Sequence, residues 1–152
     1  MNKNPTVWYR IWFVLYLSIL IYFLFFAEGF RENVTQTYHY NLIPFTEIRR
    51  YIVYHKQIGM TRVLINLLGN IVAFMPFGYI LPCMGKRPLS FWAVTLLSLD
   101  FSIAVELVQL FTRVGCCDVD DVLLNTIGGM LGYLCYWLWK GRQTNESKTE
   151  KI

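Results

Sequence analysis

The stretch SLDFSIAVELVQLF, residues 98–111, decides the fold class of this chain. It belongs to an apolar run long enough to cross a bilayer, yet it carries two carboxylates, Asp100 and Glu106. A charged carboxylate near the centre of a membrane costs about 3 kcal/mol on insertion scales. We therefore expect a membrane protein that contains a polar site, rather than a simple membrane anchor.

The composition is that of an integral membrane protein. Of the 152 residues, 55% are hydrophobic and only 16% are charged, whereas about 25% are charged in an ordinary soluble domain. The apolar residues gather in long runs, each close to the ~20 residues that a transmembrane helix needs. These runs predict four transmembrane helices, at about residues 8–27, 63–81, 89–111 and 122–139.

The predicted fold is all-α: an integral membrane four-helix bundle that forms one domain over residues 1–140. The polar residues 141–152 are expected to be a disordered cytoplasmic tail. Basic residues in short loops mark the cytoplasmic side of a membrane protein. Here they flank the first run, fill the turn between the second and third, and follow the fourth (Lys3, Arg10, Lys86, Arg87, Lys140 and Arg142). Both termini are therefore predicted to be cytoplasmic.

The long loop between the first two predicted helices, residues 28–62, would then be extracellular. Its segment PFTEIRRYIVYH, residues 44–55, places apolar side chains at helical spacing, namely Phe45, Ile48, Tyr51 and Ile52. This spacing indicates a short helix. Two positions fit it equally well: flat in the outer membrane interface, or packed against the bundle.

The third predicted helix carries one polar stripe. Six of its side chains advance by three or four residues and so share one face: Thr95, Ser98, Ser102, Glu106, Gln109 and Arg113. Such a stripe is typical of a helix that faces a bundle interior or a wet cavity. Asp100 lies nearly opposite, and we interpret it as a protonated or hydrogen-bonded carboxyl at a second helix contact.

The second and fourth predicted helices carry matching polar residues. In the predicted orientation, these polar residues lie near the same outer end as Glu106. Further along the fourth helix, Gly128 and Gly132 indicate a close contact with another helix. The convergence predicts an outward-facing polar pocket, although interhelical hydrogen bonding would explain the asparagines equally well. The candidate ligand-binding residues are Asn66, Asn70, Glu106, Gln109, Arg113, Asp118, Asp121 and Asn125.

Four ordered motifs resemble those of the VanZ-like membrane proteins. They are NLIPF at 41–45, NLLGNIVAFMPFG at 66–78, ELVQLF at 106–111 and DVDDVLLNTIGGMLGY at 118–133. The resemblance implies a four-helix protein of the bacterial cytoplasmic membrane. The motifs contain the acidic and amide residues found at matching positions in that family. The family's namesake is associated with resistance to the glycopeptide teicoplanin, but the resemblance supplies no established reaction. Asp100 and the pair Cys116 and Cys117 lie outside these motifs.

Two functions are compatible with these residues. The first is envelope protection without turnover, in which the pocket binds a glycopeptide antibiotic or the headgroup of a lipid-linked cell-wall precursor. The second is a membrane-embedded hydrolase or transferase that acts on lipid-linked envelope substrates, with Glu106 as the catalytic acid or base. The sequence has no HExxH, no GxSxG and no nucleophile with an obvious histidine partner. Binding is therefore favoured over catalysis.

The sequence predicts no cofactor and no nucleic-acid partner. Asp118, Asp120 and Asp121 are weak candidates for a divalent cation that would bridge phosphate in the enzyme alternative. Their position at the start of the fourth helix is explained equally well without a metal, because carboxylates there interact favourably with the helix dipole. The four cysteines lack a CxxC or zinc spacing, and the oligomeric state is left open.

Overall fold

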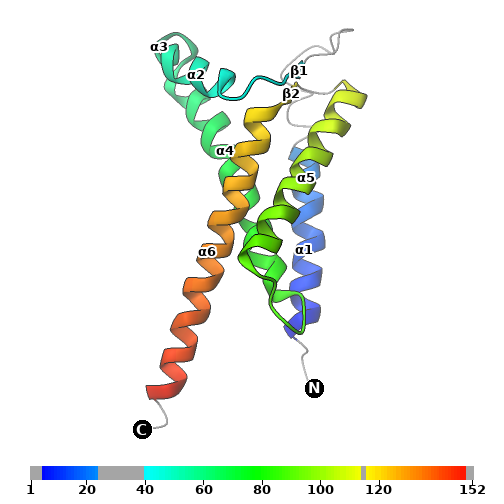
Figure 1. Cartoon of the computed structure of the whole chain (residues 1–152), viewed down its shortest axis with the longest axis vertical. Helices are drawn as coiled ribbons and strands as arrows, with labels where there is room; N and C mark the ends of the chain where they lie inside the picture. Colours follow the sequence, from blue (N-terminus) through cyan, green and yellow to red (C-terminus); the bar gives the residue numbers. More distant parts are fainter. Residues whose placement is uncertain (1–4, 24–39, 114–115, 150–152) are drawn as a thin grey trace.

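A computed structural model describes residues 5–23, 40–113 and 116–149 of the chain (Figure 1). Helices make up nearly all of it. In chain order the elements are α1 (Pro5–Tyr22), β1 (Tyr40–Asn41), α2 (Thr46–Val53), α3 (His55–Ile58), α4 (Met60–Ile80), the 3-10 helix η2 (Leu81–Cys83), α5 (Phe91–Thr112), β2 (Cys117–Asp118) and α6 (Val119–Thr149).

Three described helices are long and apolar enough to cross a membrane. These segments are Met60–Cys83, Phe91–Thr112 and Val119–Gln143, and they overlap the second, third and fourth predicted spans. The apolar helix α1 is shorter, and residues 24–27 of the first predicted span lie outside the described residues. The chain is therefore a multi-pass membrane protein.

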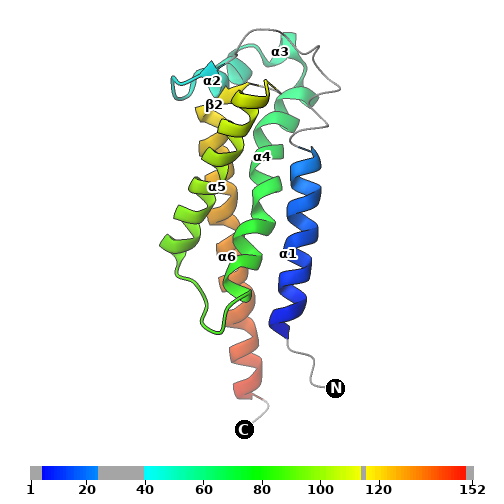
Figure 2. The same cartoon turned by 90° about the vertical axis from the view of Figure 1, so that its right-hand side faces the viewer.

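The four long helices run alongside one another (Figures 1 and 2). The described start of α1, the end of α6 and the turn between α4 and α5 lie at one end, while β1, β2, α2 and α3 lie at the other. The Tyr16 hydroxyl of α1 donates a 2.7 Å hydrogen bond to the Ala73 carbonyl oxygen of α4. The rings of Phe13 and Phe77 also meet, with centroids 5.6 Å apart. These contacts fix α1 against α4.

Glycines bring α4 and α6 into backbone contact. A Cβ added at Gly128 would overlap the Ile71 carbonyl oxygen, and one added at Gly132 would overlap the Met75 carbonyl oxygen. Small residues at such positions allow membrane helices to approach closely and gain van der Waals contact. The predicted close helix contact at Gly128 and Gly132 is confirmed, and its partner is α4.

Helix α6 extends further than the sequence predicted. The prediction of a disordered tail from residue 141 is wrong up to Thr149, because α6 continues through it. No proline interrupts the sequence there, and adding a residue to a formed helix adds one hydrogen bond without a new nucleation cost. In the long loop, a short helix does form where the apolar spacing indicated one, and it is α2.

Candidate functional site

The end of the bundle that carries α2 joins segments far apart in the sequence. The two-residue strands β1 and β2 pair in parallel, with Tyr40 opposite Cys117 and Asn41 opposite Asp118. Because β2 leads directly into α6, this pairing places residues 40–41 beside the first turn of α6. The polar side chains of α5 and α6 therefore meet a third, distant segment of the chain.

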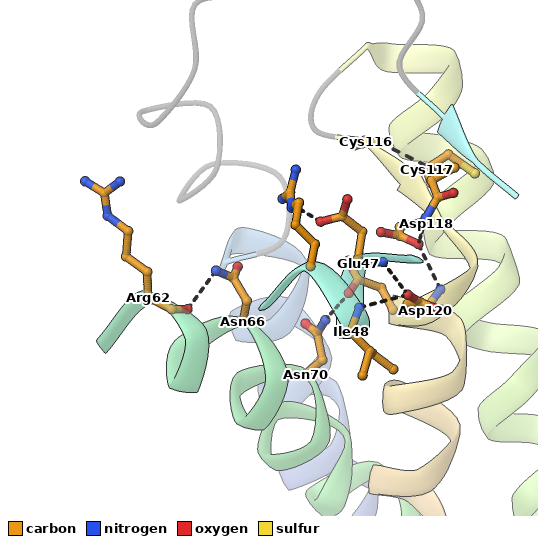
Figure 3. A network of polar contacts seen from close by, with 12 residues as sticks. Glu47, Ile48, Arg62, Asn66, Asn70, Cys116, Cys117, Asp118 and Asp120 are labelled. Atoms are coloured by element: carbon orange, nitrogen blue, oxygen red, sulfur yellow. Dashed lines mark hydrogen bonds and ion pairs between the residues drawn. The ribbon is translucent and has the colours of Figure 1, made fainter. Parts of the chain in front are cut away.

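Asp120 fixes the start of α2. Its carboxylate is only 1% exposed, and it accepts hydrogen bonds from three backbone amides (Figure 3). Oδ1 accepts from Phe45 N at 2.5 Å, and Oδ2 accepts from Glu47 N at 2.8 Å and from Ile48 N at 3.1 Å. The first amides of a helix have no partner within the helix, and a carboxylate there is also favoured by the helix dipole. Asp120 is thus a cap supplied from another helix.

Phe45 adopts an uncommon backbone conformation beside this cap. Its φ of 65° and ψ of 10° lie in the left-handed region, which costs a residue with a side chain about 1–2 kcal/mol. The hydrogen bond from its amide to Asp120 holds it there. The backbone between β1 and α2 is therefore set by α6 rather than by its own local preference.

Asp118 connects the same segment to α5. Its side chain is 5% exposed, and Oδ1 accepts from Asn41 Nδ2 at 3.1 Å and from Asp120 N at 2.9 Å. Its backbone amide donates to Glu106 Oε2 at 2.9 Å. Burial raises the pKa of the Asp118 carboxyl, although the hydrogen bond from the Asp120 amide lowers it in part. Glu106, Asp118 and Asp120 form one continuous acidic network.

The network continues deeper between α5 and α6. Glu106 and Gln109 are each 4% exposed. One turn deeper on α5, the Ser102 hydroxyl accepts a 2.8 Å hydrogen bond from Asn125 Nδ2. Among the described side chains, Asn125 Oδ1 is the one buried oxygen or nitrogen atom without a hydrogen-bond partner. The interior of the bundle therefore offers a polar acceptor near Glu106.

Two asparagines of α4 play different parts. Asn70 Nδ2 donates a 2.6 Å hydrogen bond to Asp121 Oδ1 of α6, and both residues are half-buried. Asn66 instead donates to the Arg62 carbonyl oxygen of its own helix at 2.8 Å (Figure 3). Asn70 therefore forms a hydrogen bond between α4 and α6, whereas this hydrogen bond of Asn66 lies within α4.

The predicted ligand residues gather at one end of the bundle, but many of them are engaged with one another. Glu106, Gln109, Asp118 and Asn125 are buried, and segment 40–48 covers Asp120. Arg113 is exposed where it ends α5 with a φ of 59°. Two cavities elsewhere on the described surface are apolar, one lined by Tyr9, Trp12, Leu15, Tyr16, Ile19 and Ile80 and the other by Met75, Pro76, Tyr79, Gly132 and Cys135.

The weak metal candidates do not form a ligand set. No group of three or more His, Cys, Asp or Glu side chains in the described ranges is placed to hold a metal ion. The oxygens of Asp118 and Asp120 accept amide hydrogen bonds, and Asp121 faces Asn70. Sequence reasoning missed the capping role of Asp120 and the part of Asn41. The NLIPF motif, which begins at Asn41, is the sequence signal that could have identified it.

Asp100 makes no polar contact with another helix in the ranges that the structure describes. It is exposed on α5 and has no hydrogen bond or ion pair with a described residue, so the described part of the chain does not supply the expected second helix contact. The reason is geometric. The buried side chains of α5, including Ser98 and Ser102, face α6, and Asp100 lies on the other side of the helix.

Cys116 and Cys117, at the same end of the bundle as the acidic network, carry no activated thiol. Partial burial, together with the neighbouring carboxylates of Asp118 and Glu47, raises the pKa of the Cys116 thiol to about 11. Burial raises the pKa of the Cys117 thiol as well. Because the thiolate is the reactive form of cysteine, both side chains stay protonated near neutral pH.

Comparison with known proteins agrees with this architecture. The family model described as VanZ/LLP1 matches residues 13–140. Protein VanZ of Enterococcus faecium is 29% identical over 141 residues, which cover 91% of this chain and 78% of that protein. No solved structure matches. Because the family match covers most of the chain, with α4, α5, most of α6 and the polar network, the chain belongs to the VanZ/LLP1 family.

Proposed function

We propose that this chain contributes to glycopeptide resistance of the teicoplanin type, or to protection of the cell envelope more broadly. It does so by binding the polar headgroup of the antibiotic or of a lipid-linked cell-wall precursor. The observation that carries this proposal is the burial of three carboxylates and two amides at one end of a membrane bundle: Glu106, Gln109, Asp118, Asp120 and Asn125. Ionisable residues are costly in membrane helices and mark functional sites.

The proposed site faces the outside of the bacterial cytoplasmic membrane. The elements at the opposite end of the described bundle are rich in basic residues: Arg10 lies in α1, Lys86 and Arg87 in the turn between α4 and α5, and Lys140 and Arg142 in the second half of α6. Such basic residues favour the cytoplasmic side. The Arg10 guanidinium lies 3.5 Å from the Met84 carbonyl oxygen, to which it donates a hydrogen bond at that end. We therefore propose that α1 is the first of four spans and that both termini are cytoplasmic.

The segment around β1 supplies the surface of this site. Tyr40, Leu42, Ile43 and Phe45 are each more than 60% exposed, and the Asp120 cap holds this stretch beside the acidic network. A ligand with a polar headgroup and an apolar portion needs polar and apolar groups next to each other. The half-buried pair Asn70 and Asp121 and the exposed Arg113 extend the polar side of the surface.

The contacts of Glu106 support binding rather than turnover. A general acid or base must come within about 3 Å of the proton that it transfers. Glu106 is 4% exposed, and one of its oxygens already accepts the Asp118 amide. This geometry suits a fixed negative charge within a binding site rather than a group that transfers a proton, so the enzyme alternative has less support.

Antibiotic susceptibility in a sensitive Gram-positive host tests the proposal. The strains carry empty vector, the wild-type chain, the Glu106→Gln variant or the Thr95→Val variant, with membrane levels measured for each. The Glu106→Gln variant keeps an oxygen for the Asp118 amide but removes the charge. Thr95→Val is the matched control, because it removes a hydroxyl that bonds to the Phe91 carbonyl oxygen of the same helix.

We expect the wild type and Thr95→Val to raise tolerance to teicoplanin more than tolerance to vancomycin. Glu106→Gln, at equal abundance in the membrane, should give no protection. If the wild type protects against neither antibiotic despite good expression, the resistance role does not extend to this chain. If Glu106→Gln protects fully, the acidic network is not the binding site.

A further inference from the structure

We propose that the face of α5 that bears Asp100 pairs with the same face of a second copy of this chain in the membrane. This inference is independent of the proposed function and starts from one residue. Asp100 is exposed and has no hydrogen bond or ion pair with any described residue. Carboxyl groups within membrane helices are otherwise found paired or facing a bundle interior.

The depth of Asp100 makes this exposure costly. It lies nine residues after Phe91 and twelve before Thr112, and therefore roughly 18 Å along the axis from the far end of the helix at ~1.5 Å per residue. That position is near the middle of a hydrocarbon core about 30 Å thick. No water is available there to satisfy the carboxyl, so a polar partner at the same depth would stabilise it.

The residues around Asp100 form a helix-packing seam. Six positions advance by four, three, four, three and four residues, the spacing of a left-handed helix crossing. They are Ala93, Leu97, Asp100, Ala104, Leu107 and Phe111. Leu97, Leu107 and Phe111 are 41%, 46% and 78% exposed, and Ala104 beside the carboxyl is small enough to let a second helix approach. One polar residue in such a seam fixes its register.

A second copy is the partner that meets these requirements without further assumption. Copies of one chain share one orientation in the membrane, so a two-fold axis along the membrane normal places each residue at the depth of its own counterpart. A protonated carboxyl is both a donor and an acceptor of hydrogen bonds. Two Asp100 side chains can therefore satisfy each other at a position that no other described group of the chain reaches.

Cysteine cross-linking in native membranes tests the pairing. In a background with Cys83, Cys116, Cys117 and Cys135 replaced by serine, Phe111→Cys places a thiol on the seam near the end of α5. Met60→Cys is the matched control, because Met60 is 56% exposed at the same end of the bundle but on α4. With an added oxidant, we expect a covalent dimer from Phe111→Cys and much less from Met60→Cys.

Variants at Asp100 then test the role of its carboxyl. Asp100→Asn keeps a donor and an acceptor, whereas Asp100→Leu keeps neither. In fluorescence energy transfer between labelled copies in vesicles, Asp100→Leu should raise the dissociation constant about threefold to tenfold, and Asp100→Asn should change it little. Circular dichroism checks that both variants fold. Equal cross-linking at Phe111→Cys and Met60→Cys, unchanged association of Asp100→Leu, or a Phe111→Cys cross-link to a different protein alone would overturn the proposal.

Discussion

At the scale of single residues, the end of the bundle that carries α2 depends on carboxylates that bind backbone amides. Asp120 accepts the amides of Phe45, Glu47 and Ile48, and Glu106 accepts the amide of Asp118. An unsatisfied buried donor costs about 1–3 kcal/mol. These carboxylates therefore stabilise the backbone of the site in addition to supplying its acidic groups.

Asp120→Ala should release the start of α2. The variant leaves three amides without their acceptor, so hydrogen exchange at Phe45, Glu47 and Ile48 should accelerate strongly, with a loss of about 1–2 kcal/mol of cap stability. Asp120→Asn keeps one acceptor oxygen and should fall between wild type and Asp120→Ala. Thr95→Val serves as the control. Unchanged exchange in Asp120→Ala would contradict the role of Asp120 as a cap.

The pH dependence of stability should reveal the buried Asp118. Because burial raises its folded-state pKa above the usual 3.8, the folded protein keeps a proton that the unfolded chain has lost. Stability from this group is therefore present at low pH and is lost as pH rises through the raised pKa. Asp118→Asn has an oxygen for both hydrogen bonds and no titration.

Thermal unfolding in detergent, followed from about pH 4 to about pH 7, measures this effect. The Tm of the wild type should fall relative to that of Asp118→Asn as pH increases. Glu47, whose pKa is also raised chiefly by burial and lowered in part by Arg50, titrates in both proteins, so the difference between them isolates Asp118. Parallel profiles would show that Asp118 is not the titrating group.

At the scale of elements, the contact between α4 and α6 tolerates no added side chain. Gly132→Ala would place a methyl group against the Met75 carbonyl oxygen, and such overpacking costs about 1–3 kcal/mol. We expect a lower Tm in detergent. Gly69→Ala is the control, because nothing lies within 4 Å of the added Cβ and alanine favours the helix by about 1 kcal/mol. Equal Tm values for the two variants would contradict this account of the interface.

The sequence predicts α4, α5 and α6 because long apolar runs have few structural alternatives in a membrane. It also predicts the polar stripe of α5, since helical spacing places Ser98, Ser102 and Glu106 on one face. It does not predict that Asp120 caps α2, because the bonded atoms are backbone amides more than seventy residues away and leave no periodic pattern. The sequence also does not predict that the face of Asp100 lacks a neighbouring helix among the described residues. Helical spacing shows which face of a helix a residue occupies, but not which element packs against that face.

At the scale of the whole molecule, the proposed orientation predicts which side chains water reaches from outside the cell. In the cysteine-free background, Ile43→Cys should react with a membrane-impermeant maleimide in intact cells, because Ile43 is 70% exposed beside β1. Lys86→Cys, in the turn at the opposite end, should react only after the cells are opened. The reverse pattern would place both termini outside and move the acidic network to the cytoplasmic side.

The most direct test of the binding site is a titration of the purified protein in lipid nanodiscs. Teicoplanin and a lipid-linked cell-wall precursor would be titrated by calorimetry into wild type, Glu106→Gln and Thr95→Val. The account predicts saturable binding of at least one ligand to wild type and Thr95→Val, and loss of that binding in Glu106→Gln with its helical content intact. Equal binding by Glu106→Gln and wild type, or no binding of either ligand, would contradict a headgroup site at the acidic end of the bundle.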